Sequence, residues 1–164
     1  MELFDRQFHV PFLLQTLYNP FLDEKSVLLL NMGIHFAAAV NFTNYKRVID
    51  QLISLVNEGK SHRNTVNDTK TFKGRFIWKT STALNRERFP NPHKDVRRFL
   101  TFPRVQLYNA YATSAMCRAG IDVMDVYPIS DSYPAGTWSQ TDPVHYAAHV
   151  FRDVEEFLYK MFAP

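Results

Sequence analysis

Cysteine, glycine and long apolar runs are all scarce in this sequence of 164 residues. Cys117 is the only cysteine, which excludes an internal disulfide and a cysteine-based metal cluster. The apolar run 27–30 is strand-sized, and no run approaches the roughly 20 residues of a membrane-spanning helix. The first residues also lack a basic region followed by a long apolar stretch, so no signal peptide is visible. These absences leave no evidence for a membrane span in this chain.

Charge of one sign is not abundant either, since the formal net charge is only +3. Residues 86–104 hold six basic residues and two acidic ones. We favour a solvated loop for this stretch, and the alternative is a rim that attracts an anionic substrate such as an acidic glycan. No nucleic-acid-binding motif accompanies the charge, so we expect no nucleic-acid partner. Apolar residues make up 46% and aromatic residues 15%, which favours a single folded domain over residues 1–164.

Three strand-like apolar runs alternate with three helix-like segments. The strands are predicted at residues 26–31, 74–80 and 121–127. The first, SVLLLN, is continuously apolar, as expected of a strand buried on both faces. The polar stretch 60–71 and the turn-rich stretch 128–141 are predicted to be loops.

Each helix-like segment carries a regular apolar stripe. The first helix is predicted to begin at Thr43 as its cap and to end at Gly59. The second begins at Pro103 and ends at Gly120, and the third runs from Pro143 to about Met161. The predicted core positions are Tyr45, Val48, Ile49, Leu52 and Val56 in the first helix, Val105, Tyr108, Ala112, Ala115 and Met116 in the second, and Ala147, Phe151, Val154, Leu158 and Met161 in the third.

This alternation predicts an α/β fold in which right-handed crossovers build a parallel sheet with helices on both faces, a three-layer αβα sandwich. Three strands make a thin sheet, so a first strand is expected to be missing upstream. Segment 1–25 is not placed by its pattern. Active sites in such sheets lie beyond the carboxyl ends of the strands. Here the segments leaving those ends are 31–36, 80–85 and 127–145.

Asp142 and His145 are the leading candidates for chemistry. A histidine can take a proton from a hydroxyl nucleophile if a carboxylate fixes its tautomer and stabilises the imidazolium. The plain alternative is a helix start, because aspartate is a preferred cap and Pro143 a preferred first helical residue. The two interpretations are compatible, since a capped helix end would hold the pair rigidly.

Asn31, Gly33 and His35 follow the first strand at its carboxyl end. Gly33 would let the backbone approach a ligand closely and present amides to an oxyanion, while Asn31 or His35 could add a side-chain donor. The alternative is a tight turn with an incidental histidine. None of the serines lies in a context that exposes a nucleophile at a strand-to-helix turn. We therefore expect Ser81, Ser130, Ser132 and Ser139 to satisfy turn backbone groups.

A metal site is a minor alternative. His145 and His149 are four apart, hence on one face of the predicted helix, with Asp142 or Asp153 near. The glutamate of the H-E-x-x-H pattern is absent, and no third ligand is evident. We accordingly predict no metal and no cofactor.

Four segments, in this order and spacing, resemble the C-terminal half of the SGNH (GDSL-like) PC-esterase family, specifically the neurexophilin-and-PC-esterase type. They are LNMGIHF at 30–36, FIWKTSTALN at 76–85, DVMDVYPISDSYPAGT at 122–137 and DPVHY at 142–146. The resemblance implies that Asp142 and His145 are the acid and base of a catalytic triad. It also assigns Gly33, and less directly Asn31 or His35, to the oxyanion site.

The same resemblance implies an O-acyl, typically O-acetyl, esterase or acyltransferase that acts on acylated glycans or other small esters in the secretory pathway, in the Golgi lumen or outside the cell. The sequons at Asn41 and Asn67 agree with a secretory lumen. The family's nucleophilic serine lies in a Gly-Asp-Ser block upstream, and residues 1–25 contain no serine. We therefore expect a partial domain with little or no activity as this chain. The alternative functions are a non-catalytic carbohydrate-binding domain and a metal-dependent hydrolase that uses His145 and His149.

Overall fold

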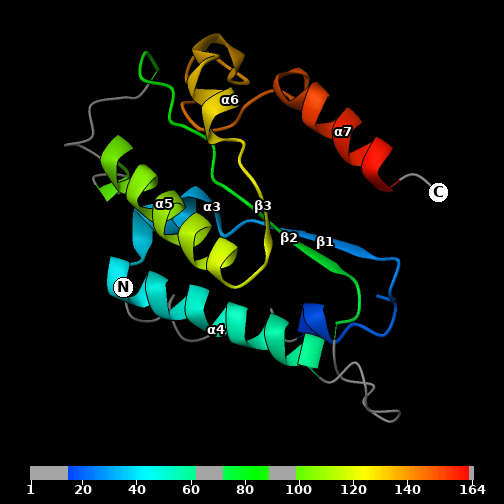
Figure 1. Ribbon diagram of the computed structural model, residues 1–164. Coiled ribbons are helices and arrows are strands. Elements are labelled where there is room, and N and C mark those ends of the chain that lie inside the picture. The colour runs from blue at the N-terminus through cyan, green and yellow to red at the C-terminus, as the bar shows by residue number, and fades with distance from the viewer. Residues whose placement is uncertain (1–14, 62–71, 89–98, 163–164) are drawn as a thin grey trace.

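The computed structural model describes residues 15–61, 72–88 and 99–162. Its centre is one parallel sheet of three strands in the order β1-β2-β3 (Figure 1). The strands are β1 (Val27–Leu30), β2 (Arg75–Lys79) and β3 (Asp122–Met124). The predicted α/β class and parallel pairing are confirmed, although the third strand ends three residues earlier than expected.

The first strand is less buried than its apolar sequence predicts. Within the described residues β1 pairs only with β2, with Leu29 opposite Ile77. Leu28 and Leu30 pack against the main core, whereas Leu29 points to the other face of the sheet and is 40% exposed. The expectation that residues 26–31 form a strand buried on both faces is therefore wrong. A continuously apolar strand sequence did not distinguish a central strand from an edge strand.

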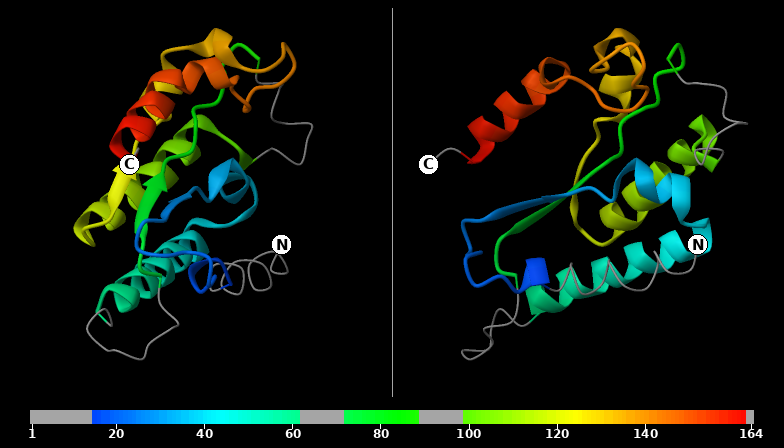
Figure 2. Two further views of the ribbon diagram at one scale, coloured as in Figure 1. Left: turned by 90° about the vertical axis from the view of Figure 1, so that its right-hand side faces the viewer. Right: turned by 180° about the vertical axis from the view of Figure 1, so that it is seen from behind.

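Two long helices cover one face of the sheet, α4 (Phe42–Ser61) and α5 (Phe102–Arg118) (Figures 1 and 2). The sheet turns Phe76 and Trp78 of β2 toward them into the main hydrophobic core. The predicted stripes of both helices are confirmed as buried: Tyr45, Val48, Ile49, Leu52 and Val56 on α4, and Val105, Tyr108, Ala112, Ala115 and Met116 on α5. Leu17 belongs to the same core, which places part of segment 1–25, and residues 1–14 lie outside the described residues.

The ends of these helices follow the sequence signals only in part. At α5 the Thr101 hydroxyl accepts the Arg104 amide, and Gly120 ends the helix with a φ of +67°. At α4 the cap is Asn41 rather than Thr43, since the Asn41 Oδ1 accepts the amide of Asn44 at 2.9 Å. Gly59 lies inside α4 and does not end it. A single glycine is tolerated there because the flanking turns already hold the backbone.

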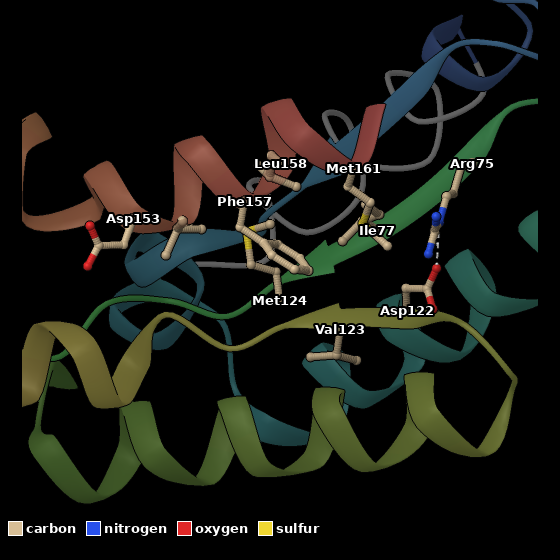
Figure 3. A pocket seen from close by; sticks show the side chains of 10 residues that line it. Arg75, Ile77, Asp122, Val123, Met124, Asp153, Phe157, Leu158 and Met161 are labelled. Atoms are coloured by element: carbon tan, nitrogen blue, oxygen red, sulfur yellow. Dashed lines mark hydrogen bonds and ion pairs between the residues drawn. The ribbon is translucent and has the colours of Figure 1, made fainter. Parts of the chain in front are cut away.

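Among the described residues, the opposite face of the sheet carries only α7 (Arg152–Phe162), which is preceded by the short helix η5 (Ala148–Phe151). No residue of α7 is buried. A cavity of about 400 Å³ separates its apolar side from the sheet, and the Arg75 Nε donates to the Asp122 Oδ2 at 2.8 Å beside it (Figure 3). Its lining residues are Arg75, Ile77, Asp122, Val123, Met124, Asp153, Val154, Phe157, Leu158 and Met161. Helices thus lie on both faces, but the second face is loosely covered.

Three short helices gather beyond the carboxyl ends of the strands. They are α3 (Gly33–Ala39), α6 (Tyr127–Asp131) and η4 (Pro134–Gly136). Residues 128–141 were predicted to be a loop, and they contain α6 and η4 instead. None of the helices in the described parts of the chain is long and apolar enough to cross a membrane.

Candidate active site

Asp142 and His145 form a hydrogen-bonded pair at this edge of the molecule. The Nδ1 of His145 lies 2.8 Å from the Oδ2 of Asp142. The other oxygen, Oδ1, accepts the amides of Val144 at 2.9 Å and of His145 at 3.0 Å. One carboxylate therefore closes its own turn and orients the imidazole, and the predicted pairing of these two side chains is confirmed in geometry.

The turn is not a helix start, so the predicted start of the last helix at Pro143 is wrong, while its second half is present as α7. The Asp142 side chain satisfies two amides as a cap would, but the chain then bends at Pro143 and Val144 and forms a bridge at Tyr146 before η5 begins at Ala148. The reason lies in the backbone carbonyls, which bond to other parts of the chain. The Asn85 amide donates to the Pro143 carbonyl at 2.8 Å, and the Thr82 hydroxyl donates to the Val144 carbonyl at 3.3 Å. A helix would need these carbonyls for its own first turn.

The charge state of Asp142 suits an orienting group. Burial raises the pKa of this carboxyl, but hydrogen bonds from the Val144 and His145 amides and from the imidazole outweigh that effect, so the pKa lies below its ordinary value of 3.8. The carboxylate is ionised at neutral pH and favours a proton on the Nδ1 of His145. The Nε2 then carries the free lone pair that a general base needs. The His145 side chain is 69% exposed, so this atom is accessible.

A short antiparallel ladder fixes the other side of the pair. Thr137 forms a bridge with Tyr146, flanked by hydrogen bonds from the Trp138 amide to the His145 carbonyl at 2.7 Å and from the Ala147 amide to the Gly136 carbonyl at 2.8 Å. His145 is therefore held from both its own turn and a neighbouring strand. Such two-sided support limits the rotation of the backbone that carries the imidazole.

Asn85 and Arg88, which sequence reasoning missed, tie this ladder to the segment that follows β2. The Asn85 Nδ2 donates to the Thr137 hydroxyl at 3.0 Å, and its Oδ1 accepts the amides of Glu87 and Arg88. The Arg88 guanidinium donates to the Thr137 carbonyl at 3.0 Å and to the Ser139 carbonyl at 2.9 Å. The available signal was a polar stretch directly after a buried strand, at the edge where sites of this fold class lie.

Two of the serines are hydrogen-bonded to backbone groups. The buried Ser130 hydroxyl accepts the Ala83 amide at 2.9 Å and contacts the carbonyls of Val126 and Tyr127. The Ser132 hydroxyl donates to the Ile129 carbonyl at 3.0 Å. Both therefore satisfy turn backbone groups, as predicted. Within the described ranges no serine or threonine hydroxyl is hydrogen-bonded to the His145 ring.

The predicted oxyanion residues lie at the end of β1. Gly33 has a φ of +54°, which favours glycine, and the Asn31 side-chain amide donates to the Lys79 carbonyl at the end of β2 at 2.7 Å. His35 is exposed on α3. Asn31 and Gly33 share one turn, but among the described residues no hydrogen bond joins that turn to Asp142 or His145. The predicted turn at Asn31–Gly33 is therefore present, but it is not hydrogen-bonded to the Asp142–His145 pair.

The arrangement proposed for a metal does not form. His145 lies outside the helices, next to the bridge residue Tyr146, and His149 lies in η5, so the two are not on one face of a helix. The His149 ring instead packs edge-on against Tyr133, with centroids 5.9 Å apart. In the described part of the chain no three histidine, cysteine, aspartate or glutamate side chains gather where they could hold a metal ion.

The basic stretch 86–104 is not a continuous free rim. The Arg88 guanidinium donates to the Ser139 carbonyl, and the Arg104 guanidinium donates to the Val40 carbonyl at 2.7 Å. Arg86 is exposed and lies 3.9 Å from a carboxylate oxygen of Asp131. Lys94, Arg97 and Arg98 lie outside the described residues. Two of its arginines are thus structural, which weakens the case for anion attraction.

Replacing Asp142 with asparagine tests the pairing through stability. Because the pKa of Asp142 is lower in the folded than in the unfolded chain, ionisation stabilises the fold above the unfolded pKa. That contribution is lost as the pH falls through the folded pKa. We expect Asp142→Asn to be less stable than wild type by about 1 kcal/mol at pH 7, since the amide keeps the turn but loses the charged hydrogen bond.

Urea denaturation at pH 7 and at pH 2.5 measures this difference. The gap between the two proteins should close at the lower pH. A gap of equal size at both pH values would show that the carboxylate charge contributes nothing to the turn. Asp142→Ala, which removes the turn acceptor as well, is the matched control and should stay destabilised at both values.

The comparisons with known proteins add no family to this geometry: no protein-family model matches the chain, and no curated protein matches it either.

Proposed function

We propose that the Asp142–His145 pair is the acid–base half of an acyl-ester site, in an SGNH-type O-acyl (O-acetyl) esterase or acyltransferase. The observation that carries the proposal is the 2.8 Å contact between the Asp142 Oδ2 and the His145 Nδ1, with the imidazole otherwise exposed. A carboxylate on one ring nitrogen and open space at the other is the arrangement by which an imidazole accepts a hydroxyl proton.

In this proposal His145 acts first as base and then as acid. Its Nε2 takes the proton of a serine hydroxyl as the oxygen attacks the ester carbonyl, and returns that proton to the leaving alkoxide. The resulting acyl-enzyme is cleaved by water or by a sugar hydroxyl. Asp142 stays ionised and stabilises the imidazolium, while the Gly33 amide, assisted by Asn31 or His35, supplies hydrogen bonds to the oxyanion.

The nucleophile is the part of the proposal that the described residues do not provide. The nearby Ser130 hydroxyl is buried and committed to backbone groups, so it is unsuited to attack. The proposal therefore requires a serine supplied from outside the described residues. The substrate class, an acylated carbohydrate or another small ester, and a location in the secretory pathway belong to the same proposal.

The chain by itself is expected to show little or no hydrolysis of an aryl acetate, because no serine or threonine hydroxyl among the described residues is hydrogen-bonded to the imidazole of His145. The measurement is the initial rate of 4-nitrophenyl acetate hydrolysis compared with that of His145→Ala. Equal rates are expected. Robust hydrolysis that His145→Ala abolishes would contradict the missing nucleophile, although it would support the base.

The positive test uses the coding sequence immediately 5′ of Met1. The proposal predicts an in-frame strand followed by Gly-Asp-Ser. The protein extended by that segment should release acetate from acetylated oligosaccharides, and His145→Ala or replacement of that serine should each lower the rate by at least about a thousandfold. An extended protein that hydrolyses no ester, or that does so equally well without His145, would sink the proposal.

A further inference from the structure

Trp138 is a large aromatic side chain that the fold leaves in solvent. Its exposed fraction is 78%, whereas the other tryptophan, Trp78, is 1% exposed in the core. An indole contributes most to binding free energy when a partner covers its face, because it carries one of the largest apolar surfaces of any side chain. The position of Trp138 shows what kind of partner that would be.

A backbone hydrogen bond places Trp138 beside His145: the Trp138 amide donates to the His145 carbonyl at 2.7 Å. This bond flanks the bridged pair of Thr137 and Tyr146. The His145 amide bonds to the Asp142 Oδ1, so this single backbone bond joins Trp138 to His145. Thr137 is buried, while Trp138 and His145 are both exposed.

The backbone under the indole is fixed as firmly as the backbone under the imidazole. The residues on either side of Trp138 each offer a carbonyl to the Arg88 guanidinium, Thr137 at 3.0 Å and Ser139 at 2.9 Å. The Trp138 amide is itself bonded to His145. The backbone of Trp138 is therefore tied to that of His145 by the fold.

We infer that Trp138 is a stacking platform for a pyranose ring, which it holds beside His145. A pyranose has an apolar face of C–H groups and a rim of hydroxyls. The face suits an indole, and the rim suits the hydroxyls of Ser139 and Thr141, which lie 3.3 Å apart and follow Trp138 in the chain. A purely apolar ligand would bury those hydroxyls without offering them hydrogen bonds, which lowers its affinity. The stacking stands on geometry alone, and only the placement of an ester beside the Nε2 rests on the proposed function.

Fluorescence provides the test, because acrylamide quenches an exposed indole and reaches a buried one poorly. The probes are cellotetraose, xylotetraose and chitotetraose, each with and without O-acetyl groups. At least one is expected to protect Trp138 from acrylamide, with a Kd of about 0.1 to 1 mM. Ligand-observed NMR should show binding at least tenfold weaker to Trp138→Ala, and binding retained within about threefold by the conservative variant Trp138→Tyr.

His145→Ala is the control that separates this inference from the proposed function. It should retain sugar binding within about threefold, because the indole is unchanged. Sugar binding without hydrolysis, even in the extended protein, would refute the acyl-ester proposal alone. Hydrolysis that is indifferent to Trp138→Ala would refute the platform alone.

Three results would overturn the platform directly. They are failure of every tetrasaccharide to protect Trp138, binding that Trp138→Ala leaves unchanged, and protection by tetramethylammonium in place of the sugars. The last would assign the indole to a cationic ligand, for which tryptophan is also the best aromatic partner.

Discussion

Asn85→Leu is expected to lower the free energy of unfolding by about 3 kcal/mol and to release the segment that carries Asp142 and His145. Leucine has the same number of side-chain heavy atoms as asparagine and the same branching, but it makes no hydrogen bonds. The Asn85 side chain is 1% exposed, donates to Thr137 and accepts two backbone amides. Leucine at this buried position would remove the donor to Thr137 and the acceptor of both amides, which costs more than the net value of the bonds themselves.

Two measurements separate stability from local order in this variant. Urea denaturation gives the change in unfolding free energy, and hydrogen exchange of the Trp138 amide, which bonds to the His145 carbonyl, reports on the ladder. We expect that amide to exchange faster than the change in global stability alone explains. Thr137→Val removes one partner of the same network and should cost about 1 to 2 kcal/mol. An Asn85→Leu protein of wild-type stability would show that the ladder does not depend on this side chain.

Gly74→Ala is expected to destabilise the fold by about 3 kcal/mol or to prevent folding. A Cβ at this position would lie 2.2 Å from the Ser26 carbonyl oxygen and 2.9 Å from that of Asp23. Both are backbone atoms of a turn that the Asp23 and Ser26 side chains already close. The Ser26 carbonyl also accepts the Arg75 amide at the start of β2, so the turn cannot move without separating β1 from β2.

Gly120→Ala is the matched control for Gly74→Ala. Gly120 has a φ of +67° but nothing within 4 Å of a built Cβ. Its substitution should cost about 1 kcal/mol, the strain of a left-handed backbone without a clash. Thermal and urea unfolding of both variants would check the ranking. Equal losses would mean that the β1–β2 entry turn can shift to admit a methyl group.

The parts of the fold that follow from periodicity could be predicted from the sequence. The stripes of α4 and α5 are long and regular, and the residues in them are buried as expected. Strand–helix alternation also predicted the parallel sheet. These features depend on which residues are apolar and how far apart they lie, and both are visible in a single sequence.

The end of the chain could not be predicted in the same way. Asp142-Pro143 carries a genuine capping signal, and the Asp142 side chain does accept the two amides that a cap would accept. Whether a helix follows depends on the carbonyls of Pro143 and Val144, which bond to Asn85 and Thr82 about 60 residues earlier. Such long-range bonds leave no local trace in the sequence.

The candidate site also has a part that is local in the sequence and a part that depends on long-range contacts. The pairing of Asp142 with His145 is local, at a spacing of three residues, and was predicted. The hydrogen bonds that hold this pair in place come also from Asn85, Arg88 and Trp138. None of these three residues lies in a sequence motif that would have predicted its role. Their roles depend on which segment the chain places beside residues 142–147.

The loose seating of α7 has a consequence for the energy landscape of the molecule. With no residue of α7 buried and a cavity beneath its apolar side, few contacts oppose its detachment from the sheet. Its amides should exchange with solvent through local opening, while those of α5 wait for global unfolding. The ladder that holds Asp142 and His145 is anchored to residues 82–88 and not to α7. We therefore expect α7 to open locally while the hydrogen bonds from residues 82–88 keep His145 in place.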